Sequence, residues 1–183
     1  EAITLDDTTL AVATLNTLDG NTSGAVNAAT VTTLTGGAAA MNTAYASGGI
    51  TGLANEAITL DDTSLAVATL NTLNGNTTGV VNANTITTLT GAAATMNTVY
   101  TAAGNGEITN LGNEAITLDD TTLAIATLNT LNGNTTGVVN ANTITTLTGA
   151  AATMNTVYTA AGNGEITNLG NEAITLDDTT LAI

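Results

Sequence analysis

The chain has 183 residues, contains no Lys, Arg, His, Cys, Pro, Trp or Phe, and carries a formal net charge of −15. An acidic surface of this kind repels nucleic acid and anionic membranes, which leaves divalent cations, basic molecules or the chain itself as partners. Because 43% of the residues are apolar and only 8% are charged, we expect a folded protein rather than a disordered acidic tail.

A long segment recurs along the whole chain. It opens with EAITLDD at Glu1, and the same opening returns at Glu56, Glu114 and Glu172. A nearly fixed period of this length is typical of solenoids, in which each unit buries its apolar face against its neighbours. We therefore divide one continuous solenoid into repeat 1 (1–55), repeat 2 (56–113), repeat 3 (114–171) and the start of repeat 4 (172–183).

Each repeat contains two diverged halves. Leu89 and Gly104 correspond to Leu118 and Gly133, which lie half a repeat further along the chain. A half-repeat of about 29 residues fits one solenoid coil. Repeat 1 is three residues shorter than the others, and its deficit falls at 46–55, where Gly and Asn cluster, so we expect a surface loop there.

The first predicted helix of repeat 2 begins after Asp62, because an aspartate side chain can accept hydrogen bonds from the free N–H groups of a first helical turn. Ala66, Leu70 and Leu73 then share one face, with Leu65 beside them. The segment 74–75, Asn-Gly, ends the helix, since glycine adopts the left-handed conformation at low cost.

The second helix follows two short β-branched runs, 80–81 and 86–89, which we predict to be strands. Thr90 is the expected N-cap. Met96, Val99, Tyr100 and Ala103 then follow the i, i+3, i+4, i+7 pattern of a buried helix face, and Gly104 closes the helix. We interpret the Met and Tyr positions as core packing.

Two further runs, 107–111 and 115–118, are predicted strands, and Gly112 with Asn113 between them could form a two-residue hairpin loop. Two geometries remain open. If each half-repeat adds one strand to a sheet, strands about 4.8 Å apart accompany helices that need about 8–10 Å, and the solenoid must curve. If both strands join the same sheet, a straight rod results.

The Thr and Asn residues allow two interpretations. Stacked coils place identical side chains above one another, so that asparagines can hydrogen-bond along the axis as a ladder. Alternatively, turn chemistry explains segments such as NGNTTG and NANT without any ladder.

The predicted fold is an α/β solenoid in which strand-helix coils of about 29 residues stack into an elongated rod. An all-β parallel solenoid is the alternative. No atypical segment marks a cap at Glu1 or Ile183, so we expect end-to-end or lateral contact between copies, which gives open filaments rather than rings. The acidic charge opposes such contact, so salt or divalent cations should strengthen it.

The composition argues against an enzyme. His and Lys are absent, and serine occurs only at positions 23, 47 and 64, so a nucleophile and a general base are hard to assemble. The carboxylate pair Asp61–Asp62, repeated at 119–120, could in principle perform acid-base chemistry. We interpret it instead as a helix N-cap that also interacts favourably with the helix dipole.

No cofactor is expected, although calcium is possible because it takes oxygen ligands from carboxylates and carbonyls. The candidate metal ligands are Glu114, Asp119 and Asp120, which cluster in sequence. The D-x-[DN]-x-[DN]-G loop and the G-G-x-G-x-D nonapeptide are both absent. A helix N-terminus also carries positive partial charge, so the N-cap role is the preferred interpretation of these residues.

The segments EAITLDDTTLAVATLNTLNGNTTGVVNANTITTLTG and GAAATMNTVYTAAG resemble the tandem repeats of very large acidic surface or secreted proteins of cyanobacteria, some of which are similar to RTX-type exported proteins. The resemblance covers the whole chain and implies an extracellular or cell-surface location with a structural or adhesive role. It implies no functional residue, and the calcium nonapeptides of RTX proteins are missing from this sequence.

We therefore expect a structural repeat protein that forms an extracellular or cell-surface rod or filament. The alternative is the spacer or stalk of a calcium-dependent adhesin or of a glycan-binding surface protein. Glycan recognition usually needs aromatic platforms, and the chain offers only Tyr45, Tyr100 and Tyr158. No apolar run approaches the roughly 18 residues needed to cross a bilayer, so no membrane insertion is expected.

Overall fold

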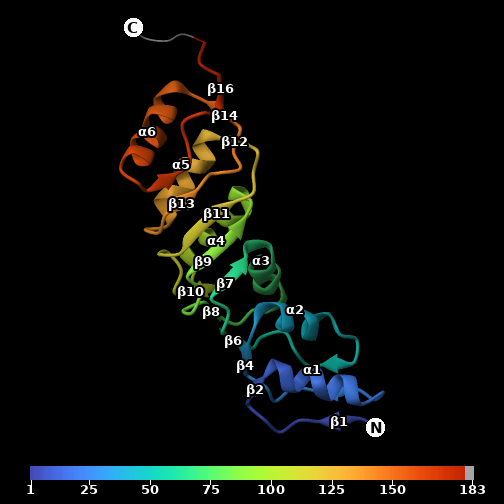
Figure 1. Ribbon diagram of the computed structural model, residues 1–183. Coiled ribbons are helices and arrows are strands. Elements are labelled where there is room, and N and C mark those ends of the chain that lie inside the picture. The colour runs from blue at the N-terminus through green and yellow to red at the C-terminus, as the bar shows by residue number, and fades with distance from the viewer. Residues whose placement is uncertain (180–183) are drawn as a thin grey trace. The chain divides into compact units, whose positions relative to one another are not determined.

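A computed structural model of the chain describes residues 1–179, in which short strands and helices alternate in a repeating order (Figure 1). It confirms an α/β solenoid-like fold, with strand-helix units of about 29 residues and parallel sheets that stack consecutive repeats. The all-β alternative is wrong, because every full repeat contains helices.

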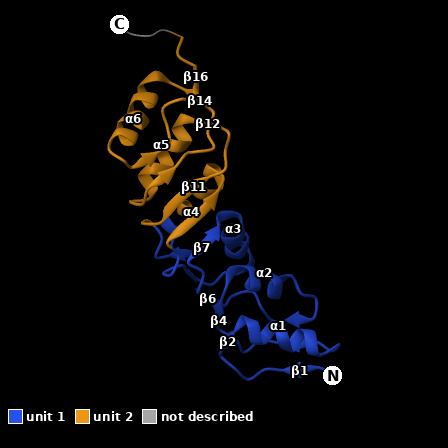
Figure 2. Ribbon diagram, in the orientation of Figure 1, with its two compact units in different colours: residues 1–86, 102–111 blue, residues 87–101, 112–183 orange. Residues whose placement is uncertain are grey.

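The chain forms two compact units (Figure 2). The first contains residues 1–86 and 102–111, and the second, as far as it is described, contains residues 87–101 and 112–179. The helix α4 (Ala93–Gly104) has residues in each unit. Repeat 2 therefore contributes to both units.

The first unit contains three complete helices and a series of short strands. In chain order these are β1 (Ile3–Thr4), β2 (Thr9–Ala11), α1 (Val12–Asn21), β3 (Val26–Asn27), β4 (Thr33–Gly36), α2 (Ala38–Ala46), β5 (Ile50–Thr51), β6 (Ala57–Leu60), β7 (Ser64–Ala66), α3 (Val67–Asn76), β8 (Val81–Asn82) and β10 (Ile108–Thr109).

The strand β6 of the first unit pairs with strands of two successive repeats. Parallel sheets run in the orders β1-β3-β5 and β10-β8-β6-β4-β2. Within the second, β6 pairs with β4 on one edge and with β8 on the other, so that Ile58 lies beside Leu34 and Val81. The strand β6 is thus the last strand added to the sheet by the coils of repeat 1 and the first strand on which the coils of repeat 2 build.

The second unit repeats this arrangement. Its elements are β9 (Thr88–Gly91), β11 (Ala115–Leu118), β12 (Thr122–Ala124), α5 (Ile125–Asn134), β13 (Val139–Asn140), β14 (Thr146–Gly149), α6 (Ala151–Gly162), β15 (Ile166–Thr167) and β16 (Ala173–Leu176). Strands β15, β13, β11 and β9 follow one another in one sheet, and β12, β14 and β16 form another. Here β11 is the shared strand, with Ile116 between Leu89 and Val139.

Strand register explains the repeat length. Leu123 pairs with Leu147 and Leu147 pairs with Ile174, so the second coil of a repeat is three residues longer than the first. The remaining length of the repeat is the segment that connects Ile116, in the shared strand β11, to Leu123, in β12. The two strands of a coil enter two different sheets, and each sheet gains one strand per coil, so the alternative in which both strands join the same sheet is wrong.

The three residues that repeat 1 lacks shorten a helix, although most of the segment 46–55 is irregular and lies at the surface, as expected. The helix α2 has 9 residues, whereas its equivalents α4 and α6 have 12. In repeat 1 both coils therefore have the same length, as the pairing of Leu10 with Leu34 and of Leu34 with Ile58 shows.

Two predicted helix starts are also wrong. Asp62 is followed by the strand β7, and α3 begins only at Val67 and ends at Asn76. Thr90 lies within β9, and α4 begins at Ala93. The C-terminal residue of α4, Gly104, agrees with the sequence prediction.

The predicted hairpin at residues 112–113 is wrong because the flanking strands do not pair with each other. The strand β10 pairs with β8, whereas β11 pairs with β9 and β13, and all three pairings are parallel. The predicted strands themselves occur, with boundaries shifted by up to two residues, and 115–118 agrees in full. Short strands were therefore readable from composition, but their partners were not.

The helices bury one apolar face and satisfy their threonines internally. On α3, Val67, Leu70 and Leu73 are at most 1% exposed. The exposed Thr72 hydroxyl donates to the Ala68 carbonyl one turn earlier, at 2.9 Å. Such back-bonding lets threonine occupy a helix surface without an unpaired hydroxyl.

Both interpretations of the asparagines apply. Asn110 Nδ2 donates to Asn82 Oδ1 at 2.8 Å, which is one rung of a ladder between stacked coils. The same Asn82 oxygen accepts from the Asn84 N–H at 3.2 Å, which is turn chemistry. In the second unit, Asn168 and Asn140 repeat the rung, also at 2.8 Å.

Gly79 allows two backbone segments to pass in contact. A Cβ at this position would overlap the Glu56 carbonyl, whereas one at Gly75 meets nothing within 4 Å. We expect Gly79→Ala to lower the free energy of unfolding by at least about 2 kcal/mol. Gly75→Ala, in the last turn of α3, should raise it by about 0.5 kcal/mol. Urea denaturation of both variants tests this, and equal effects would contradict it.

Candidate functional site

A buried glutamate opens each repeat after the first. Glu56 and Glu114 are 0% exposed and Glu172 is 9% exposed. The chain contains no Lys, Arg or His, so no cationic side chain can balance these carboxylates. A buried carboxylate without a counter-charge needs strong hydrogen-bond donors instead.

Backbone N–H groups and a tyrosine supply those donors. The Glu114 carboxylate accepts from the Gly112 N–H at 3.2 and 2.9 Å and from the Tyr100 hydroxyl at 3.0 Å. Its backbone carbonyl accepts from Thr135 Oγ1 at 2.8 Å. In the first unit Glu56 is held in the same way, with Tyr45 donating at 2.8 Å. The hydrogen bond between tyrosine and glutamate therefore joins the second helix of one repeat to the first residue of the next repeat.

Sequence reasoning missed this pair. It placed Glu114 among calcium ligands and interpreted the tyrosines only as core residues. The available signal was their joint recurrence, because Tyr100 and Tyr158 precede Glu114 and Glu172 at the same spacing. Tyr45 precedes Glu56 at a spacing that is three residues shorter, and this difference is the shorter helix α2.

Burial and hydrogen bonds shift the pKa values of Glu172 and Tyr100. Burial alone would raise the pKa of Glu172, but the N–H of Gly170, further backbone N–H groups and the Tyr158 hydroxyl together lower it. Burial, and then the charge of Glu114, raise the pKa of Tyr100 well above its usual range. The folded state thus favours a charged Glu172 and a neutral Tyr100.

The second aspartate of each Asp-Asp pair after the first caps a helix of the preceding coil. Asp120 Oδ2 accepts from the N–H of Ala93, the first residue of α4, at 2.8 Å. In the first unit, Asp62 does the same for Ala38 of α2, at 2.7 Å. The N-cap interpretation of Asp120 was correct in kind, but the capped helix belongs to the coil before it rather than following it directly.

The structure does not bring the three calcium candidates together as one site. Glu114 is buried in its hydrogen-bond cluster, Asp120 caps α4, and Asp119 is exposed. In residues 1–179 no group of three or more His, Cys, Asp or Glu side chains could hold a metal ion. The paired aspartates considered for catalysis likewise have separate roles, since Asp62 is occupied as a cap.

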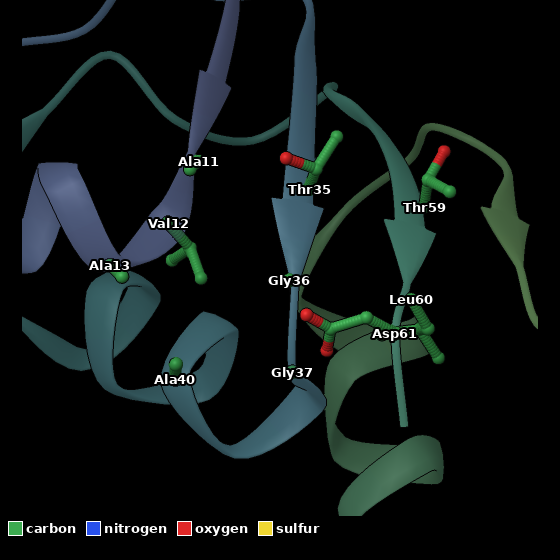
Figure 3. Close-up of a pocket in the computed structure, with 10 residues that line it drawn as sticks. All are labelled: Ala11, Val12, Ala13, Thr35, Gly36, Gly37, Ala40, Thr59, Leu60 and Asp61. Carbon is green, nitrogen blue, oxygen red and sulfur yellow. The ribbon is translucent and has the colours of Figure 1, made fainter. Parts of the chain in front are cut away.

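A cavity of about 280 Å³ lies in the first unit, where the strands β2, β4 and β6 end (Figure 3). Small residues, among them Gly36, Gly37 and Ala40, form much of its lining. The polar side chains at the cavity are Thr35, Thr59 and Asp61. The carboxyl ends of parallel strands are where α/β sheets commonly bind ligands.

The cavity belongs to a place where repeat 1 has smaller side chains than repeat 3. Gly37 corresponds to Ala150, and Ala40 corresponds to Thr153. The backbone does not differ, because Gly37 has φ −74° and ψ 142° and Ala150 has φ −73° and ψ 141°. At this position the two repeats therefore differ in side-chain size and not in backbone conformation.

Removal of the inter-coil cap should weaken the fold. We expect Asp120→Ala to lower the free energy of unfolding by about 1 kcal/mol, because the first N–H of α4 loses its acceptor. Asp119→Ala is the matched control, since Asp119 is exposed and adjacent, and should change it by less than about 0.5 kcal/mol. Chemical denaturation measures both. Equal losses would contradict the capping role.

The tyrosines predict an alkaline loss of stability. Because folding raises the pKa of Tyr100, its contribution is complete below the unfolded value of about 10 and is lost as the pH rises from there towards the folded value. Denaturation between pH 8 and 11.5, which brackets about 10, should show a smaller loss in Tyr100→Phe than in the unmodified chain. Equal pH dependence would be evidence against this.

The same variant should be less stable at pH 8, below the tyrosine pKa of about 10. The buried Glu114 carboxylate loses a donor, which costs about 1–3 kcal/mol. Tyr158→Phe provides the comparison, because Tyr158 is only half-buried and its partner Glu172 is the most exposed of the three glutamates. Its loss should be smaller.

No helix within residues 1–179 is long and apolar enough to cross a membrane. No protein-family model, curated protein or solved structure matches the chain. The argument for function therefore rests on the geometry of the repeats and of the clusters described above.

Proposed function

We propose that this chain is a structural repeat protein that forms a rod or filament outside the cell or on its surface. Its unit of construction is the strand-helix coil, and its expected partners are other coils of the same sequence together with divalent cations. The buried and capping carboxylates support this role. Asp62 and Asp120 cap helices, and Glu56 and Glu114 accept tyrosine hydrogen bonds at the boundaries between repeats.

The burial that one coil gives to the next is the observation that carries the proposal. Ile116 and Leu118 of β11 are each 1% exposed, and β13 of the next coil pairs with β11. Their equivalents on β16, Ile174 and Leu176, are 49% and 42% exposed. The described repeats thus bury two large apolar side chains of one coil beneath the next, and the same contact between copies would extend the stack.

Electrostatics sets the conditions for such assembly. The chain carries 15 carboxylate side chains and no cationic one. Contacts between copies bring these like charges together, and screening by salt or divalent cations reduces their repulsion. Calcium in this proposal acts by neutralising a surface and needs no dedicated site.

The extracellular location rests on the resemblance to acidic cyanobacterial surface proteins and on durability. With no Lys or Arg, the chain has no trypsin site, and its described part contains no thiol that oxidation could alter. A long-lived external structure is consistent with both features. A glycan-binding role receives less support, because Tyr100 is 8% exposed and is occupied by Glu114.

Electron microscopy of the purified chain, first in chelator and then in millimolar calcium, tests the proposal. We expect filaments much longer than one chain in calcium and fewer or shorter ones in chelator. Ile174→Asp should shorten them, because it places a charge on the face that a following coil covers. Val138→Asp is the matched control, since Val138 is 44% exposed beside a strand already paired within its sheet.

Two outcomes would count against the filament. Short particles in both solutions would favour a spacer or adhesin stalk instead. Equal shortening by the variants at positions 174 and 138 would show that added charge, rather than loss of the coil face, controls assembly.

A further inference from the structure

We infer that copies of this chain join by strand replacement. Residues 172–178, here called the trailing segment, take the place that residues 1–7, the leading segment, hold on the strand β3 of a second copy. Both segments have the sequence EAITLDD. The inference rests on the proposed assembly of copies, and it names the strand that one copy offers and the surface on the other copy that receives it.

Two inner copies of EAITLDD show what a complete junction contains. They occupy residues 56–62 and 114–120 and include the shared strands β6 and β11, each of which is paired on both edges. Among the described residues, β1 of the leading segment pairs only with β3, and β16 of the trailing segment pairs only with β14. The edge that is unpaired in one segment is therefore the edge that is paired in the other.

The coil that follows each heptapeptide receives it through recurring contacts. At the first inner copy, β8 pairs with β6 and Thr77 Oγ1 donates to the Glu56 carbonyl at 2.8 Å. At the leading segment, β3 pairs with β1 and Thr22 Oγ1 donates to the Glu1 carbonyl. Because the trailing segment has the same sequence as the leading segment, β3 of a second copy can hold it through these same contacts.

Hydrogen bonds give the replacement a direction. The trailing segment is anchored on its own copy, where Tyr158 donates to the Glu172 carboxylate at 3.0 Å and Asp178 Oδ2 accepts from the Ala151 N–H at 2.7 Å. Among the described residues, the hydrogen bonds of the leading segment all go to the coil that follows it. The trailing segment therefore stays in place when two copies meet, and the leading segment leaves.

The replacement exchanges equal strand pairings and adds apolar burial. The pairing of β1 with β3 is lost, and a pairing of β16 with β3 that involves the same residue types is gained. Ile174 and Leu176 are 49% and 42% exposed, whereas their equivalents Ile58 and Leu60 in the inner copy are each 1% exposed. The following coil of a second copy would cover the first pair in the same way.

The helix α1 adds to this gain. Leu18 on α1 is only partly buried, whereas its equivalent Leu73 is 0% exposed on α3, which packs against α2. The helix α6 corresponds to α2 and would cover α1 of the next copy. These gains oppose the lost burial of Ile3 and Leu5. Since the leading segment competes for the receiving surface, it restrains assembly.

One substitution made in both segments tests the replacement. Ile3→Ala weakens the competitor and should lengthen filaments, whereas Ile174→Ala weakens the incoming strand and should shorten them. Both variants make the same change in the same heptapeptide and keep the net charge, so each is the control for the other. Electron microscopy in millimolar calcium measures filament length, and circular dichroism checks folding. Shorter or unchanged filaments in Ile3→Ala would overturn the inference and leave the filament proposal standing.

The free heptapeptide provides a readout that needs no filaments. The ¹⁵N-labelled chain is titrated with acetyl-EAITLDD-amide in chelator and in salt near 0.15 M, where the Debye length is about 8 Å. We expect saturable shifts of the Val26 and Asn27 amide signals. The tethered leading segment competes at an effective concentration on the order of 1 mM, so Ile3→Ala should tighten peptide binding about tenfold.

A scrambled peptide of the same composition is the control for the titration. Equal binding of both peptides, or no saturable binding of EAITLDD to a folded Ile3→Ala variant, would overturn the inference. Specific peptide binding without filaments in any solution would instead count against the proposed filament, while the recognition of this heptapeptide by β3 would remain.

Discussion

The lack of any cationic side chain constrains the whole structure, because every carboxylate that leaves water must be met by a neutral donor. Glu114 is buried against the Gly112 N–H and the Tyr100 hydroxyl, and Asp120 accepts from the first N–H of α4. Backbone N–H groups and a tyrosine hydroxyl take the place of cationic side chains at these carboxylates. Within the described residues no buried side-chain polar atom lacks a hydrogen bond, so the interior tolerates charge without a cationic side chain to pair with it.

The shared strands β6 and β11 give the fold its second constraint. Each has a neighbour from the preceding repeat on one edge and a neighbour from its own repeat on the other. The chain can therefore move from one pair of sheets to the next through a strand that is paired on both edges. Strands of four residues or fewer suffice, since adjacent coils bury the apolar side chains that such a short strand could not bury alone.

Sequence reasoning recovered what is local. The repeat period is visible directly, and the strand at 115–118 and the buried helix face of Met96, Val99 and Tyr100 follow from patterns within a dozen residues. It failed where a side chain acts on distant backbone. Nothing near Asp62 indicates that its carboxylate meets Ala38, and nothing near residues 112–113 indicates that the flanking strands have different partners. The cavity was not predictable for another reason, since its lining comes from three strand ends that are far apart in the sequence.

Each inter-coil cap comes from a residue that follows the capped helix in the sequence, so the coils complete their hydrogen bonds in chain order. Ala93 starts a helix whose N-terminal N–H is satisfied only by Asp120, so α4 is incomplete until 27 further residues are available. Asp62 stands in the same relation to α2. During synthesis, when residues emerge from the amino end first, each coil is completed only when the aspartate of the following coil is available. Folding of such a chain advances as a front that trails the emerging residues by about one coil.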